Sequence, residues 1–135
     1  MFDSSSAQKA ERQAADLAKR VGDGLLLMYV VEPPMLPPEA LPLTERVASL
    51  ETWAKGYLHD EARSLSSPSL EVRTEVAIGA AAEILAMTAA RDDIEFVVVG
   101  SRGRNAVARL LLGSVASSLS HLCPKPLLIV RTEKA

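Results

Sequence analysis

Two glycines and a Gly-Ser pair follow an apolar, strand-like segment in the last third of the chain. The segment 94–99 (IEFVVV) is followed by Gly100, two residues separate Gly100 from Gly103, and nine more separate Gly103 from Gly113 and Ser114. Glycines let the backbone approach a phosphate closely, and the first N–H groups of a helix bind anions. Gly113 and Ser114 stand where a helix is expected to begin, and the Ser114 hydroxyl can donate to the same anion. This spacing predicts a phosphate-binding loop.

A tight turn and a helix start with no ligand would also account for these glycines. An isolated Gly-x-x-Gly favours that alternative, whereas the nine-residue spacing and the Gly-Ser pair favour a ligand. Arg102 and Arg104 supply positive charge, and Arg109 either does the same or points to solvent. The loop is not a Walker P-loop, because no Gly-Lys-Ser/Thr closes it. It is not the dinucleotide fingerprint either, because that motif follows the first strand and opens a helix directly.

Helical and strand-like patterns alternate along the chain and would position this loop. Small and apolar residues at three- and four-residue steps predict helices, and short apolar runs predict strands that are covered on both faces, as in a parallel sheet. The expected helices cover 4–20, 44–65, 79–91 and 114–122, and the expected strands cover 25–31, 70–78, 94–99 and 127–130. The strand at 70–78 alternates apolar and charged residues, which predicts a solvated face near a sheet edge.

This order predicts an α/β fold: a doubly wound, open parallel sheet with helices on both faces. A length of 135 residues, 48% of them hydrophobic, fits a single domain over 1–135. An order that opens on a helix has only four strands, and residues 2–4 resemble the tail of another strand. The first strand of such a sheet usually lies near its middle, so its absence would leave both neighbouring strands without hydrogen-bond partners.

Composition excludes several other classes of function. Fifteen Lys and Arg against 17 Asp and Glu give a net charge of −2 with no basic half, which disfavours nucleic-acid binding. One cysteine and two histidines cannot supply a Cys- or His-rich zinc site. No apolar run reaches the roughly 20 residues that span a bilayer, and residues 1–4 show no signal region. We therefore expect a cytoplasmic protein without nucleic-acid or membrane partners.

The whole pattern resembles the universal stress protein family, and its ATP-binding branch in particular. The resemblance rests on Gly100-x2-Gly103-x9-Gly113-Ser114, on the Cys-Pro-x-Pro that stops the following helix, and on the final LLIVR strand. It covers nearly the whole chain. It implies a five-stranded parallel sheet with ATP across the strand ends. The first strand of that sheet is largely absent here, since Met1 and Phe2 alone stand in place of about five or six strand residues.

The resemblance implies a site for ATP, with Mg²⁺ arriving on the nucleotide. Gly103, Gly113 and Ser114 would hold phosphates, and Gly100 would frame the turn beside the ribose. The main chain of Val30 would meet the adenine. Asp3 would meet the adenine or the ribose, or would simply cap the first helix. The full expected set is Asp3, Val30, Gly100, Ser101, Arg102, Gly103, Gly113, Ser114 and Val115.

We expect a nucleotide-dependent stress-response or regulatory protein rather than a fast enzyme. No general base or water-positioning residue is evident in the sequence, so any ATPase activity should be slow or absent. His59 and His121 have no partners at the spacing of a catalytic triad, and we expect both on solvated helix surfaces. Trp53 and Tyr57, four residues apart on one helix, are expected to pack rather than to stack on a base.

The resemblance also implies a homodimer, for which the apolar last strand at 127–130 offers an edge. The alternative function is a nucleotide-free homodimeric interaction module of the same fold. A hydrolase with pyrophosphatase-like chemistry is disfavoured. Its Ser-Gly-Gly-x-Asp loop would follow the first strand, and residues 3–6 lack the glycines.

Overall fold

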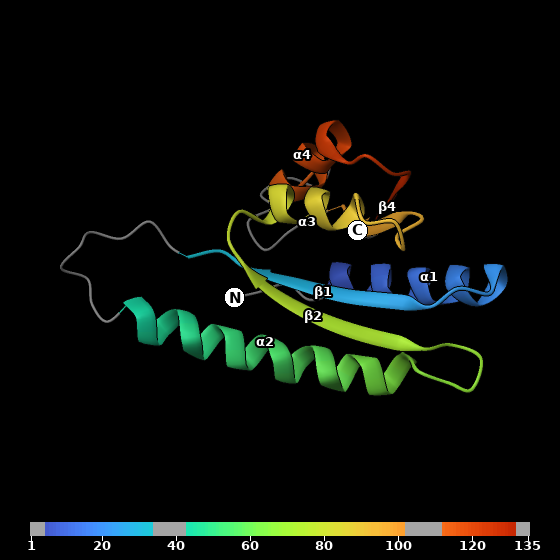
Figure 1. Cartoon of the computed structure of the whole chain (residues 1–135), viewed down its shortest axis with the longest axis horizontal. Coiled ribbons are helices and arrows are strands. Elements are labelled where there is room, and N and C mark those ends of the chain that lie inside the picture. Colours follow the sequence, from blue (N-terminus) through green and yellow to red (C-terminus); the bar gives the residue numbers. More distant parts are fainter. Residues whose placement is uncertain (1–4, 34–42, 102–111, 132–135) are drawn as a thin grey trace.

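The computed structural model describes residues 5–33, 43–101 and 112–131, and within them helices and strands alternate in the predicted order (Figure 1). The elements are α1 (Ser5–Val21), β1 (Leu25–Val31), α2 (Leu43–Leu65), β2 (Val72–Ile78), α3 (Ala81–Ala89), β3 (Val97–Gly100), α4 (Ser114–Leu122) and β4 (Leu127–Val130). The α/β class with parallel strands is therefore confirmed.

Some element bounds differ from the predicted ones, for local reasons. β2 begins two residues late because Leu70 closes a turn instead, exchanging main-chain hydrogen bonds with Ser67 at 3.0 and 3.2 Å. α3 begins at Ala81 rather than at Gly79. Gly79 extends the strand pairing, since its N–H donates to the Val31 carbonyl at 2.9 Å. Its φ of +149° is a conformation that glycine adopts readily and other residues rarely do.

The described strands form two separate parallel pairs rather than one continuous sheet. β1 pairs with β2 along its whole length, and β3 pairs with β4 in the same way. Within the described ranges, β1 and β3 are paired with no strand on their other edges.

The free edge of β1 follows from the alternation of main-chain groups along a strand. The Leu25 N–H donates to the residue before β2, and the Val31 carbonyl accepts from the residue after β2, both at 2.9 Å. Odd-numbered residues of β1 therefore face β2. The main-chain groups of Leu26, Met28 and Val30 point to the opposite edge.

The same argument defines the free edge of β3. The Val97 N–H donates to the residue before β4, and the Ser101 N–H donates to the last residue of β4, both at 2.9 Å. The main-chain groups of Val98 and Gly100 therefore point away from β4. The unpaired edges of β1 and β3 thus face away from β2 and β4, and α1 contacts β1, β3 and β4.

Helices cover both faces of the paired strands. α3 and α4 contact each other and lie on the opposite side of β1 and β2 from α2 (Figure 1). α1 is joined to α2 by the Tyr57 hydroxyl, which donates to Glu11 Oε2 at 3.3 Å. The buried face of α1 consists of small residues, which allows a close approach to the strands. These are Ala10, Ala14, Ala15 and Ala18. No described helix combines the length and the apolar character that crossing a membrane requires.

Candidate functional site

The end of β3 and the start of α4 are held together by two main-chain hydrogen bonds. The Ser101 N–H donates to the Val130 carbonyl at 2.9 Å, and the Ser101 carbonyl accepts from the Gly113 N–H at 2.7 Å. Ser101 is only 7% exposed. Four of the predicted site residues are thereby brought together, since Gly100 and Ser114 directly adjoin this junction. The α4 helix begins beside the carboxyl end of a strand, where the sequence predicts it.

The start of α4 offers main-chain N–H groups that could bind an anion. Gly113 is the N-cap, is buried, and has an extended backbone with φ −63° and ψ 163°. It has no side chain to cap the helix. Among the described residues, no side chain bonds to the first N–H groups of α4. Ser114 is exposed and Val115 is half-buried, so both lie in the first turn with the positive end of the helix dipole.

The start of α3 is different, because a carboxylate of the protein already occupies it. Glu32 directly follows β1, and its Oε2 accepts a hydrogen bond from the Ala81 N–H at 2.9 Å. Of the two helix starts near the strand ends, that of α3 therefore holds a carboxylate of the protein, and that of α4 holds none from the described residues. Sequence analysis missed this role of Glu32. Its partner lies 49 residues away, and no local pattern signals such a cap.

Val30, the predicted adenine contact, lies near the carboxyl end of β1 in the other half-sheet. It is half-buried and forms a register pair with Ala77 of β2. Its own main-chain groups point away from β2, as the alternation along β1 requires. They face the same gap as those of Gly100. Both residues therefore have main-chain groups that no strand pairing uses in the described ranges.

Three predicted site residues lie outside the described residues. These are Asp3, Arg102 and Gly103, and the additional cations Arg104 and Arg109 fall in the same undescribed segment. One phosphate-binding glycine and the charge-neutralising arginines therefore stay predictions.

A cavity of about 580 Å³ lies between β1 and β3. Of the predicted site residues that the structure describes, Gly100 alone lines it. The cavity extends along the strands to Asp23 and Glu95, near their amino ends. It is therefore a feature distinct from the Ser101–Gly113 junction.

A half-buried carboxyl lies on the α1 side of this cavity. Glu11 Oε1 is buried and has no hydrogen-bond partner among the described residues, while Oε2 accepts from Tyr57. Burial, and then the neighbouring Glu61 carboxyl, raises the pKa of Glu11 from 4.5 to about 8. The same burial, together with the carboxyls of Glu11 and Glu61, raises the pKa of Tyr57. Burial and the Glu61 carboxyl therefore favour the protonated form of Glu11.

The aromatic and histidine residues lie as the sequence predicts. Trp53 and Tyr57 stack with ring centroids 5.4 Å apart, and Tyr29 of β1 meets Trp53 edge-on at 5.7 Å. His59 and His121 are both exposed. The described residues contain no group of three or more side chains that could hold a metal ion.

Comparison with known proteins gives consistent matches. A sequence profile of the universal stress protein family matches residues 2–131. A universal stress protein of Mycolicibacterium smegmatis is 42% identical over 78 residues, which is 56% of this chain and 59% of that protein. The chain spans less than two thirds of the length of the curated relatives it matches.

Solved structures agree with the sequence matches. Universal stress protein UspA from Lactobacillus plantarum has a TM-score of 0.82 and 25% identity, over 94% of this chain and 90% of that one. A universal stress protein solved in complex with cAMP has a TM-score of 0.61 and 22% identity, over 96% of this chain and 91% of that one. The second likeness concerns the fold alone.

Proposed function

The chain belongs to the universal stress protein family, and on that basis we propose that it binds ATP at the carboxyl ends of β1 and β3. The observation that carries this proposal is the Gly113 N–H to Ser101 carbonyl hydrogen bond of 2.7 Å. It sets the uncapped first turn of α4 beside the end of a strand. The N–H groups and the dipole of that turn favour phosphate. A family member that forms a complex with cAMP is a further, weaker support.

Each described residue has a definite role in this proposal. The main-chain N–H groups of Ser114 and Val115, with the Ser114 hydroxyl, bind the terminal phosphates. Gly100 lets the chain pass close to the ribose, and Ser101 fixes the start of α4. The unpaired main-chain groups of Val30 face the adenine edge and select it by hydrogen bonding.

Three further residues complete the proposed site from segments outside the described ones. Gly103 and Arg102 add phosphate contacts, and Asp3 meets the ribose or the adenine. Mg²⁺ would be bound mainly by the phosphates, because the described side chains form no cluster of metal ligands. We propose a regulatory, cytoplasmic module with little or no hydrolysis, in which the bound nucleotide changes the conformation or the partner.

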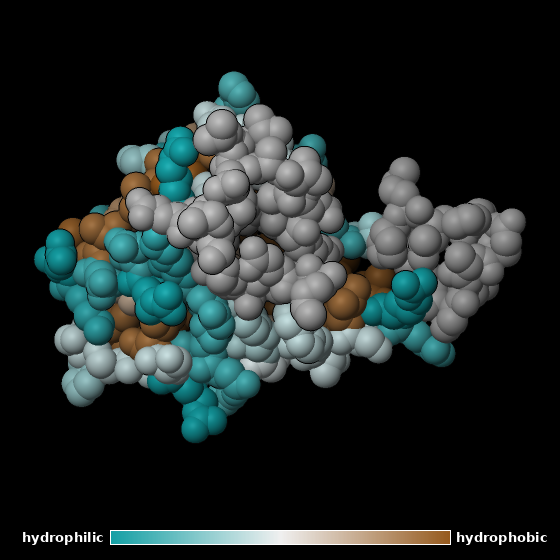
Figure 2. Space-filling view, turned by 180° about the vertical axis from the view of Figure 1, so that it is seen from behind, coloured by the Kyte–Doolittle hydropathy of each residue, from teal (hydrophilic) through white to brown (hydrophobic). Residues whose placement is uncertain are grey.

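The proposed homodimer forms through the outer edge of β4. Within the described ranges this strand pairs only with β3, so the main-chain groups of Leu127 and Ile129 are left for another strand. Leu128 is 40% exposed. Figure 2 shows hydrophobic residues reaching the surface in several places among hydrophilic ones. Sedimentation of the full chain, alone and with MgATP, tests the dimer.

Thermal denaturation with and without MgATP tests the nucleotide site. We expect millimolar MgATP to raise the melting temperature, because a ligand that binds only the folded state stabilises it. Gly113→Val should abolish the shift by placing a side chain in the phosphate path. The extended backbone of Gly113 accommodates valine, so the substitution tests space rather than backbone strain.

Gly56→Val is the matched control, because Gly56 is exposed on α2 and a Cβ there meets nothing within 4 Å. It should keep the full MgATP shift. A Gly113→Val protein that binds normally would refute the assigned residues. The absence of any shift in the wild type, and of nucleotide in the denatured protein, would leave the nucleotide-free interaction module as the function.

A further inference from the structure

Two carboxyls and a tyrosine hydroxyl meet between α1 and α2. The Tyr57 hydroxyl donates to Glu11 Oε2 at 3.3 Å. The Glu61 carboxyl, one helical turn after Tyr57 on the same face of α2, lies within hydrogen-bonding reach of Glu11. All three side chains are half-buried. We name these three residues the acidic contact, since they join α1 to α2 through two carboxyls.

The acidic contact connects two helices that are supported by different strands. α1 packs chiefly on β3 and β4, whereas α2 packs on β1 and β2. Each helix therefore has its own support in the fold. A change at the acidic contact can move one helix relative to the other without unfolding either of them.

The surroundings of Glu11 require a proton. Its Oε1 atom is buried and has no hydrogen-bond partner among the described residues, whereas its Oε2 atom accepts from Tyr57. An ionised carboxyl only accepts hydrogen bonds, so two carboxylates cannot bond to each other. One proton between Glu11 and Glu61 makes one carboxyl a donor and the other an acceptor. It therefore removes the cost of leaving a buried oxygen unpaired.

The charged and titratable neighbours of Glu11 act in both directions. Burial and Glu61 favour its protonated form, while the Tyr57 hydroxyl and the Arg12 guanidinium favour the carboxylate. The first two are stronger, so the pKa of Glu11 rises from 4.5 to about 8. From β1, Tyr29 acts on Tyr57. The strands β3 and β4, on which α1 also packs, contain apolar residues and glycine and add no charge.

We propose that Glu11 and Glu61 share one proton, and that this proton holds α1 and α2 together, so that the acidic contact opens in alkaline solution. When the proton leaves to water, two carboxylates face each other at a half-buried position, where solvent screens their repulsion poorly. Separation of the helices lets water reach both groups. This inference does not depend on the proposed nucleotide function, because none of its residues belongs to that site.

The raised pKa of Glu11 sets the pH range of the response. Between pH 4.5 and about 8, the closed form holds a proton that the open form has lost. The ratio of open to closed molecules therefore rises with pH in this range, by at most about tenfold per pH unit. Solvent around the half-buried pair reduces this slope. Above about pH 8 both forms have lost the proton, and the ratio becomes constant.

Energy transfer between the two helices measures the opening. The donor is Trp53, the single tryptophan of the chain, which lies on α2 and stacks on Tyr57 at 5.4 Å. The acceptor is a dansyl group on Gln13→Cys, at an exposed position of α1, in a chain that also carries Cys123→Ser. From pH 6 to pH 8 we expect a reversible loss of transfer that corresponds to at least about a tenfold rise in the open-to-closed ratio. Helix content, followed by circular dichroism, should not change.

Two glutamine substitutions test the shared proton. Glu11→Gln keeps an acceptor for Tyr57 and can donate from its amide to Glu61, so this variant should stay closed at every pH. Glu61→Gln supplies an amide donor to an ionised Glu11, so it should also lose the response. Asp60→Asn is the matched control. It removes a carboxylate from an exposed position next to Glu61 and should keep the full response.

Three results would overturn the proposal. Transfer that is constant from pH 6 to pH 9 would show that the helices do not separate. A loss of transfer that persists in both glutamine variants would assign the response to other groups. A loss that coincides with a loss of helix content would be alkaline unfolding of the chain rather than the separation of two folded helices.

Discussion

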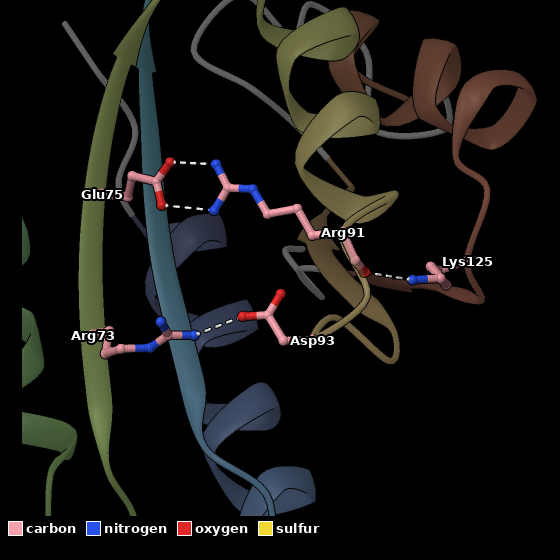
Figure 3. A network of polar contacts seen from close by, with 5 residues as sticks. All are labelled: Arg73, Glu75, Arg91, Asp93 and Lys125. Atoms are coloured by element: carbon pink, nitrogen blue, oxygen red, sulfur yellow. Dashed lines mark hydrogen bonds and ion pairs between the residues drawn. The ribbon is translucent and has the colours of Figure 1, made fainter.

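Lys125 donates a hydrogen bond from its Nζ to the main-chain carbonyl of Ile94 at 2.6 Å, which ties the turn before β4 to the segment before β3; its hydrogen bond to the Arg91 carbonyl is drawn in Figure 3. The same ammonium donates to the Ala89 and Arg91 carbonyls, both at 2.9 Å. All three donors of the side chain are therefore used, and one of them meets the last carbonyl of α3, where the helix dipole also favours a cation. One side chain thus connects α3, β3 and β4.

Lys125→Met should lower the free energy of unfolding by about 2 kcal/mol, because methionine keeps the aliphatic stem and leaves three carbonyls without their donor. Urea denaturation measures the loss. Lys55→Met is the control, since Lys55 is exposed and its ion pair with Glu51 spans 3.8 Å. That variant should change stability by less than about 0.5 kcal/mol. Equal effects of the two substitutions would contradict the structural role of Lys125.

The raised pKa of Glu11 predicts how the stability of the chain depends on pH. Its pKa is raised from 4.5 to about 8 in the folded state, so between these values the folded chain holds a proton that the unfolded chain has lost. The stabilisation is complete below about pH 4.5 and is lost as pH rises through about 8. The steepest slope that one such group allows is about 1.4 kcal/mol per pH unit, and solvent around this half-buried carboxyl reduces it.

Glu11→Gln should flatten this profile, because glutamine keeps the acceptor for Tyr57 and cannot ionise. The variant should match the wild type near pH 4 and exceed its melting temperature near pH 8.5. Asp16→Asn, at an exposed position on the same helix, should retain the wild-type slope. A wild-type profile that is flat between pH 5 and pH 8 would mean that Glu11 is ionised in the fold.

Replacing glycine with alanine should have opposite effects on stability at Gly79 and at Gly56. Gly79 has a φ of +149°, and a Cβ there would lie 2.6 Å from Ile84 Cδ1, so Gly79→Ala should destabilise the chain by about 1–2 kcal/mol. Gly56 is in the interior of α2 with nothing within 4 Å of a Cβ, so Gly56→Ala should stabilise it by about 0.5–1 kcal/mol. Chemical denaturation of both variants checks the sign of each change in the free energy of unfolding. A Gly79→Ala protein as stable as the wild type would refute the positive-φ turn.

The sequence predicts those parts of the fold that depend on the local spacing of apolar residues and glycines. The apolar run at 25–31 and the glycines after 94–99 locate β1 and the end of β3. The contacts of Glu32 and Lys125 could not be predicted in this way. Their partners lie 49 residues away for Glu32 and 31 to 36 residues away for Lys125, so only the packed chain brings them together.

The raised pKa of Glu11 also depends on contacts between residues that are far apart in the sequence. Glu11 contacts Tyr57, which lies 46 residues later in the sequence, so no local pattern signals its partial burial. At the candidate site, the spacing of Gly100 and Gly113 predicts their proximity. The main-chain hydrogen bond through Ser101 that holds them together was not predicted, because it depends on where the intervening loop returns.

Variants of Glu32 test whether the phosphates of the proposed nucleotide bind at the start of α3 or at the start of α4. Its carboxylate caps α3 through the 2.9 Å hydrogen bond from Ala81, so Glu32→Ala should lower stability by about 1 kcal/mol. Glu32→Gln keeps a hydrogen-bond acceptor but loses the negative charge, so it should lower stability by less than Glu32→Ala does. The loss of stability in Glu32→Gln should shrink with added salt. If the phosphates bind at α4, both variants should keep the MgATP shift in melting temperature, which Gly113→Val loses. Loss of the shift in Glu32→Ala, in a protein that remains folded at the assay temperature, would instead assign the phosphates to the neighbourhood of α3.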